Sequence, residues 1–339
     1  MTRAIKVADA NARRQEQTYF WISNEQALFL RHTPDTRHPS APRYYDAIEV
    51  DRATGTETRL NAFNGRYRSW LIATRMHCHL VDEAGNLMEP VETVYLPPTC
   101  ALSPDGKWLL WHSHAVPPMW IAATVDGAGE RKWPDTGELL SNQMQWLHDS
   151  RRWLTLYQSY QRKRYRFIGA VIHSLEDAVA DQPIRLGDVP DGMVLGITEV
   201  GDLLIARYPY GERAPQVDFS ACGMHPGVAV TRDYTVPLPT PLAVHGLALS
   251  PQGDRMAWLL GDMDNRLVAG AIVGLWVSDL KGRDMREVDC VPVIEQATEG
   301  ERTHFDLPAE LRWLPDGAHL SFLYRNALWV VPIEREQQI

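Results

Sequence analysis

The chain has 339 residues, of which 45% are hydrophobic and 23% are charged, and its formal net charge is −9. This acidic balance argues against a general nucleic-acid binder and against a protein that binds anionic membranes, because both need a basic surface that neutralises phosphate. No apolar run approaches the roughly 18 residues of a membrane-spanning helix, and the N-terminal sequence lacks the apolar segment of a secretion signal.

One plan recurs six times along the chain: a large apolar residue, a polar turn and a second apolar run. In chain order the copies begin at Trp21, Leu102, Trp146, Ile197, Leu249 and Trp313. The turns contain Pro, Asp, Asn, Gln or Gly, which are typical hairpin residues. In the run that follows, apolar side chains alternate, as at Leu109 and Trp111, which is the spacing of a strand. Each copy therefore predicts two antiparallel strands joined by a tight turn.

A third strand is predicted after several of these hairpins. Its copies are Ala47–Val50, Met119–Ile121, Leu275–Val277 and Leu328–Val330. Glycine-containing segments follow at 51–60, 125–133 and 279–288, and each predicts a turn that leads into a fourth strand. Four short antiparallel strands that repeat in this way are typical of the blades of a β-propeller.

The spacing of the copies predicts the number of blades. The longest interval, from Trp21 to Leu102, has room for two blades of about 40 to 50 residues each. Strand and turn character is present in it at 69–75, 77–86 and 89–96. We therefore expect an all-β propeller with seven four-stranded blades, with six as the alternative. The last copy ends one strand short, and the N-terminal segment 3–9 is suited to complete it, so that residues 1–339 form a single propeller domain.

Three of the turn segments carry a resemblance to a known family. They are SPDGKWLLW at 103–111, SPQGDRMAW at 250–258 and LPDGAHLSF at 314–322. These segments resemble the WD40-like repeats of the TolB type, and the similarity extends over nearly the whole chain. The resemblance implies a β-propeller. It implies no single function, because such propellers serve as scaffolds, ligand binders and enzymes.

Most of the tryptophans occupy repeated positions. Trp21, Trp146 and Trp313 share one position, Trp111 and Trp258 share a second, and Trp120, Trp276 and Trp329 share a third. Tryptophans that recur with the repeat are expected to pack in the core between blades rather than to form a sugar-binding surface. Trp70 and Trp133 lie outside this pattern, and we expect these two to be the exposed ones.

Two His-x-His pairs raise the question of a metal site. His112 and His114 end the second strand of one repeat, and His77 and His79 have the same spacing in the expected degenerate blade. Imidazoles from neighbouring blades could hold manganese, zinc or a similar divalent metal. The chain also resembles the oligogalacturonate lyases in repeat type, which implies a metal-dependent polysaccharide or oligosaccharide lyase as the alternative function. Surface or hydrogen-bonded histidines without a metal are the competing interpretation.

The connections after the second strands are expected to gather on one face of the propeller. They are 31–45, 112–118, 157–166, 207–227 and 261–270, and they are rich in Tyr, Arg and His. Tyr and Arg are frequent in binding interfaces, because one part of the side chain packs while another part hydrogen-bonds. The candidate ligand contacts are Arg43, Tyr160, Arg162, Arg164, Tyr208 and Tyr210. For the basic run 162–166, a solvated hairpin with cross-strand charge pairs is the competing interpretation.

No nucleophile elbow, P-loop or dinucleotide-binding loop is present, so we name no catalytic residue. We expect a non-catalytic binding or scaffold propeller without a cofactor. Its partner is a protein, or an acidic small molecule or carbohydrate, bound at the loop-rich face, and neither nucleic acid nor a membrane is expected. The sequence leaves the oligomeric state open.

The cysteines bear on the compartment. Cys78, Cys100, Cys222 and Cys290 are scattered, and none forms a CxxC pair, so neither a zinc ribbon nor a thioredoxin-like motif is expected. Free, mostly buried thiols are typical of proteins in a reducing compartment. We therefore expect a protein of the bacterial cytoplasm.

Overall fold

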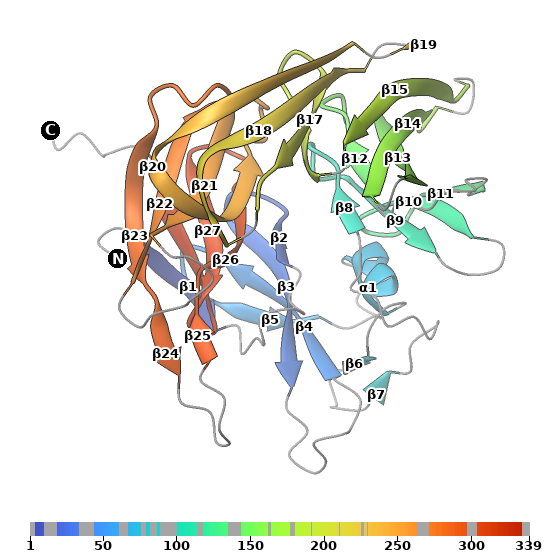
Figure 1. Ribbon diagram of the computed structural model, residues 1–339. Helices are drawn as coiled ribbons and strands as arrows, with labels where there is room; N and C mark the ends of the chain where they lie inside the picture. Colours follow the sequence, from blue (N-terminus) through green and yellow to red (C-terminus); the bar gives the residue numbers. More distant parts are fainter. Residues whose placement is uncertain are drawn as a thin grey trace, which may run out of the picture. The chain divides into compact units, whose positions relative to one another are not determined.

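The repeats fold as antiparallel β-sheets in a computed structural model (Figure 1). The structure describes residues 4–9, 19–33, 44–60, 67–75, 79–81, 87–88, 100–113, 118–134, 144–161, 164–176, 180–190, 192–209, 211–224, 227–228, 230–262, 271–296 and 304–333. The chain divides into two compact units. The C-terminal unit contains Met1–Val7, Tyr160–Ile168 and Ile184–Ile339, and the N-terminal unit contains Ala8–Ser159 and Gly169–Pro183. The expectation of a single propeller domain over residues 1–339 stays a prediction.

Two sheets lie within the N-terminal unit. The first contains β2 (Tyr19–Trp21), β3 (Gln26–Thr33), β4 (Tyr44–Asp51) and β5 (Glu57–Arg59), and β4 also pairs with β6 (His79–Val81), which pairs with β7 (Leu87–Met88). The second is four-stranded, in the order β11 (Glu130–Pro134), β10 (Met119–Thr124), β9 (Trp108–Ser113) and β8 (Cys100–Leu102). These strands follow one another in the blade order that the repeats predicted.

The C-terminal unit contains a seven-stranded sheet that joins two repeats. Its order is β16 (Met193–Ile197), β17 (Asp202–Arg207), β18 (Arg213–Gly223), β20 (Thr231–Leu249), β21 (Arg255–Gly261), β22 (Ile272–Asp279) and β23 (Arg286–Pro292). The joint is β20, a strand of 19 residues that curves in Figure 1 and pairs first with β18 and then with β21. A separate pair is formed by β24 (Ile294–Gln296) and β25 (His304–Asp306).

A further sheet of the structure is five-stranded. Its order is β12 (Met144–Trp146), β13 (Arg152–Gln161), β14 (Arg164–Ser174), β15 (Gln182–Pro190) and β19 (Gly227–Val228). The first four strands are the repeat predicted to begin at Trp146. The short β19 comes from the segment between β18 and β20, and it pairs in parallel with β15.

The N-terminal strand completes the sheet of the last repeat, as predicted. This four-stranded sheet has the order β1 (Ile5–Asp9), β28 (Ala327–Pro332), β27 (His319–Tyr324) and β26 (Ala309–Trp313). Just before β1, the backbone N–H of Ala4 donates a hydrogen bond to Oδ2 of Asp289 over 3.0 Å. Strand pairing between the two ends of the chain covers an edge of β28 that would otherwise be open to other chains.

The strand expected at 69–75 is wrong, because this segment forms the helix α1 (Arg68–Arg75). Trp70, Leu71 and Ala73 are buried, and the spacing between Trp70 and Ala73 is that of one helical face. Trp70 is only 1% exposed, so the expectation that it is exposed is also wrong. The described residues confirm no seventh four-stranded blade in this interval. No helix in the described part of the chain is long and apolar enough to span a membrane.

Most tryptophans at repeated positions are buried in the core, as predicted, whereas Trp276 and Trp329 are half-buried and pack against it. The register of one of the buried ones differs from the prediction. Trp111 and Trp258 are at most 1% exposed. Trp276 pairs with Trp258, but Trp120 pairs with His112 rather than with Trp111. Trp120 is therefore one residue out of register with Trp276, and it points to the opposite face of its sheet. On that face it packs in a cluster with Trp146 and Trp153.

The described cysteines are free thiols, as predicted. Cys222 is buried, and burial raises the pKa of its thiol above the ordinary value. Cys100 and Cys290 are half-buried. Cys78 lies outside the described residues.

Candidate binding site

The structure describes the side chain of one of the predicted ligand contacts, Tyr208. Tyr160 and Arg164 lie in β13 and β14, but their side chains lie outside the described part of the chain, as do the residues Arg43, Arg162 and Tyr210. Residues 164–166 of the basic run therefore lie in a strand rather than in a long loop, because β13 extends to Gln161 and β14 begins at Arg164.

The prediction of a loop at 207–227 is wrong over most of this range, because β18 occupies 213–223. Buried Val217 and Phe219 alternate in it with the more exposed Gln216 and Asp218, and this alternation is that of a strand with one face in the core. The remaining connection, at 208–212, is short and contains Tyr208.

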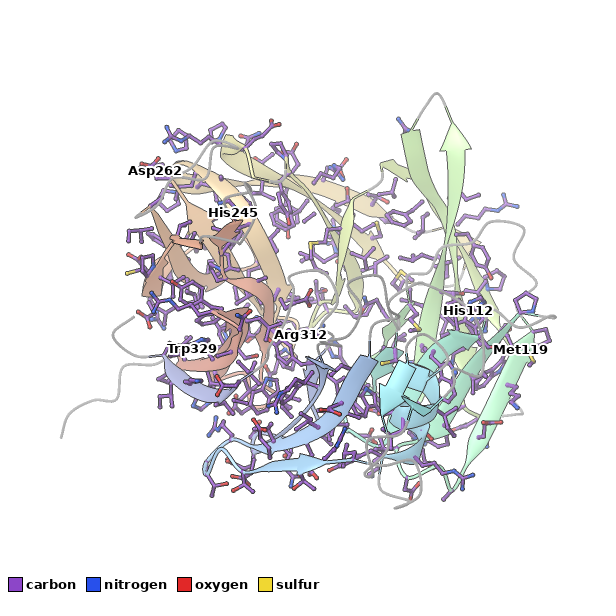
Figure 2. All side chains as sticks on the ribbon, turned by 90° about the horizontal axis from the view of Figure 1, so that it is seen from below. His112, Met119, His245, Asp262, Arg312 and Trp329 are labelled. Atoms are coloured by element: carbon purple, nitrogen blue, oxygen red, sulfur yellow. The ribbon has the colours of Figure 1, made fainter. Side chains whose placement is uncertain are left out.

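His112 lies in the core rather than at the surface. It is 1% exposed, and its ring centroid lies 4.5 Å from that of Trp120 on the adjacent strand β10 (Figure 2). His77 and His114 lie outside the described residues, and His79 belongs to β6 with its side chain outside them. Among the described residues no group of His, Cys, Asp or Glu side chains could hold a metal ion. The metal site therefore stays a prediction, and His112 is the candidate ligand whose surroundings are known.

His173 makes a polar contact that the sequence did not indicate. Its Nε2 lies 3.1 Å from the hydroxyl oxygen of Thr155, and its Nδ1 lies 3.1 Å from Oδ1 of Asp181. The ring stacks on Trp153, with 4.2 Å between the centroids. Thr, His and Asp in this order have the connectivity of an activated nucleophile. Thr155 is only 2% exposed, however, and a substrate would need access to its hydroxyl, so the burial assigns this contact to the core.

Repeat positions explain why this polar contact is present. Thr155 has the repeat position of Trp258, and His173 that of Ser278. In the C-terminal unit Nε1 of Trp258 donates a hydrogen bond to Oγ of Ser278 over 3.0 Å. In the repeat that contains Thr155, the sizes of the two side chains are reversed. The ring of His173 is on the third strand, and the small hydroxyl side chain of Thr155 is on the second. The available sequence signal was a Thr at a position where three other copies have the aromatic residues Trp111, Trp258 and Phe322.

Tyr208 contacts Met193 at one end of the seven-stranded sheet. This is the end at which the loops after the second strands were predicted. The hydroxyl of Tyr208 donates to the sulfur of Met193 over 3.4 Å. Met193 begins β16, is 45% exposed, and pairs with Ala206 near the end of β17. A phenol and a thioether are thus held together where solvent reaches both.

An ion pair and an exposed isoleucine also lie at this end of the sheet. The guanidinium of Arg213, at the start of β18, lies 2.6 Å from Oδ1 of Asp262 and donates to the Asp262 carbonyl over 3.0 Å. Asp262 follows β21, and Gly261 pairs with Val273, so Asp262 comes beside the start of β22 (Figure 2). That start is Ile272, which is 47% exposed.

The last repeat joins the same surface through Tyr324. Ile272 pairs with Pro292, and the carbonyl of Pro292 accepts a hydrogen bond from the hydroxyl of Tyr324. The guanidinium of Arg325 lies over the Tyr324 ring, 5.5 Å from its centroid. We call Met193, Tyr208, Arg213, Asp262, Ile272, Pro292 and Arg325 the loop-end surface. All of these residues belong to the C-terminal unit.

Beneath this surface lies His245, the residue at a β-bulge. The pairing of β20 with β21 shifts between Val244 and Gly246, which leaves His245 as the extra residue. It is 8% exposed, and a Cβ added at Gly261 would lie 2.9 Å from its Nε2. Burial lowers the pKa of the imidazole below its ordinary value of 6.5, because the charged form loses its hydration. Figure 2 shows His245 and Asp262 at this end of the sheet.

The buried His245 predicts a loss of stability in acid. Since its folded pKa is lowered, the unfolded chain takes up the proton first, and the free energy of unfolding falls as the pH drops below 6.5 toward the folded pKa. The variant His245→Gln should show a shallower decrease of the urea midpoint between about pH 6.5 and pH 5. If the urea midpoints of wild type and His245→Gln decreased equally with pH, the lowered pKa of His245 would be contradicted.

No protein-family model and no curated protein matches the sequence. Solved structures of β-propellers do resemble it. TolB from Acinetobacter baumannii is 12% identical, with 90% of this chain and 79% of that chain covered and a TM-score of 0.42. An oligogalacturonate lyase in complex with manganese is 12% identical, with 98% and 93% covered and a TM-score of 0.48. The C-terminal WD40 domain of Sif2 is 11% identical, with 98% and 97% covered and a TM-score of 0.40. The successive antiparallel sheets of the structure agree with the predicted propeller repeats. The likeness to these solved structures says nothing of function.

Proposed function

We propose that the protein is a non-catalytic binding propeller that recognises a protein partner through the loop ends of its strands, with the loop-end surface as part of the contact area. The observation that carries the proposal is that exposed Met193 and Ile272 lie at the same end of the sheet as Tyr208 and the ion pair of Arg213. These large apolar side chains lie at 45% and 47% exposure on either side of Tyr208 and Arg213.

The composition of the loop-end surface supports this role. Met, Tyr and Arg are enriched in protein interfaces, and Met adapts its shape to different partners. Tyr208 is partly buried against the core, so little of its conformational freedom is left to lose on binding. The other predicted contacts belong to the proposal as further binding residues: Arg43, Tyr160, Arg162, Arg164 and Tyr210.

A pair of matched double variants tests the proposal. Met193→Asp with Ile272→Asp places two charges on the loop-end surface, whereas Val200→Asp with Val230→Asp places two charges at the opposite end of the same unit. The valines are 70% and 71% exposed, so both variants should fold. We expect the loop-end variant to lose about tenfold in the capture of proteins from a lysate of the source organism, measured by quantitative mass spectrometry.

The control variant should capture the same proteins as the wild type. Equal capture by the wild type and the loop-end variant would contradict the proposal, as would the absence of any protein retained by the wild type over a bare matrix. Circular dichroism of each variant establishes that a change in capture does not come from unfolding.

A further inference from the structure

The hairpin between β27 and β28 has an unusual residue at its tip. Tyr324 pairs with Ala327, so Arg325 and Asn326 alone connect the two strands. Their φ angles are 52° and 53°, as a type I′ turn requires. Asn and Gly adopt this conformation readily, and Asn326 agrees with that preference. An arginine does not, because its Cβ is strained at positive φ.

The side chain of Arg325 rests on a rigid platform. Its guanidinium lies over the ring of Tyr324, which is 2% exposed. The hydroxyl of Tyr324 is bonded to the carbonyl of Pro292, and its own carbonyl accepts a hydrogen bond from Nε1 of Trp329 over 2.7 Å. A guanidinium positioned in this way loses little freedom when it binds a ligand.

The charge of Arg325 is available to a partner. The residue is exposed, and within the described parts of the chain its guanidinium forms an ion pair with no carboxylate. Other arginines of this unit are paired: Arg207 with Asp233, Arg213 with Asp262 and Arg312 with Glu310. A strained backbone that supports a positioned cation with no carboxylate partner among the described residues is expected where the cation has a function outside its own fold.

We propose that the partner of the loop-end surface presents an acidic peptide segment, and that Arg325 binds one of its carboxylates through a charge-assisted, bidentate contact. The inference rests on the proposed function and deepens it. The carbonyl of Pro292 is hydrogen-bonded to Tyr324, and Ile272 pairs with Pro292, so the segment that fits carries an apolar side chain beside its acidic one.

The variant Arg325→Asn separates binding from folding. Asparagine is favourable at this turn position, so the variant should melt at the same temperature as the wild type or higher. The probe is a fluorescein-labelled heptapeptide with one leucine between aspartates, and the reference probe replaces the aspartates by asparagines. The wild type should bind the aspartate peptide better than the asparagine peptide by fluorescence anisotropy, and Arg325→Asn should reduce the affinity for the aspartate peptide about tenfold.

The control is Arg283→Asn, which removes an exposed arginine from the tight turn before β23 at the other end of the unit and should bind like the wild type. Unchanged affinity in Arg325→Asn would overturn the inference, and so would a lower melting temperature than that of the wild type. If the wild type did not prefer the aspartate peptide, the inference that the partner is acidic would be wrong. The capture result for Met193 and Ile272 would still stand. Loss of that capture result would instead remove the proposed function.

Discussion

Replacing Trp153 by alanine is expected to lower the free energy of unfolding by about 3 to 5 kcal/mol. Trp153 is 0% exposed, and its ring lies 4.2 Å from that of His173 and 5.5 Å from those of Trp120 and Trp133. Because three rings surround it, removing the indole leaves a cavity that the strands cannot close without losing their pairing. Urea denaturation followed by circular dichroism measures the loss.

Trp133→Ala is the matched control for this substitution. Trp133 belongs to the same ring cluster, but it lies on the edge strand β11 and is only half-buried. Its removal exposes less apolar surface and leaves an opening to solvent rather than a cavity, so about 1 to 2 kcal/mol should be lost. An equal loss in the two variants would show that the cluster is not organised around Trp153.

The hairpin chemistry of the repeats was readable from the sequence because it is local. Gly106, Gly253 and Gly317 follow Pro-Asp or Pro-Gln, and their φ angles are 72°, 75° and 63°. Each donates its N–H to the carbonyl three residues earlier. Turn residues of this kind and period-two alternation depend on neighbours in the sequence, so four strands per repeat could be predicted without tertiary information.

The long strand β20 could not be predicted in the same way. Its segment 231–249 contains Pro237, Pro239 and Pro241, and proline cannot donate to a strand ladder, so the sequence indicates a loop there. In the structure β20 leaves the ladder of β18 between Pro237 and Leu242 before it continues toward β21. The prolines lie where β20 passes from one repeat to the next, and only the strand order reveals that passage.

The candidate site was predictable only in part. Tyr208 follows a second strand and was named from that position. Met193 and Ile272 begin other strands, and they reach the same surface only because the sheet order brings β16 and β22 to one end of the sheet. The repeat pattern does not determine exposure at a strand start, since Tyr19 and Met144 begin first strands and are buried, whereas Met193 begins one and is exposed.

Gly253→Ala is expected to lower the free energy of unfolding by about 2 to 5 kcal/mol, from strain at positive φ and from a steric clash. A Cβ at Gly253 would lie 2.5 Å from the carbonyl oxygen of Ile197 and 2.6 Å from the backbone N of Glu199, which itself donates to the Gly253 carbonyl over 3.0 Å. Each of these atoms is backbone, so none can rotate away. The turn of one repeat is thus packed on the turn of the preceding repeat.

Gly201 separates the two contributions. It has the same repeat position and a φ of 85°, but a Cβ added there would meet nothing within 4 Å. Gly201→Ala should therefore lose only the backbone strain, about 1 kcal/mol. Urea denaturation of both variants measures the difference, which reports the packing of one turn on the next. Equal losses would mean that the two turns move apart freely, and the contact between Gly253 and Glu199 would then contribute nothing to holding successive repeats together.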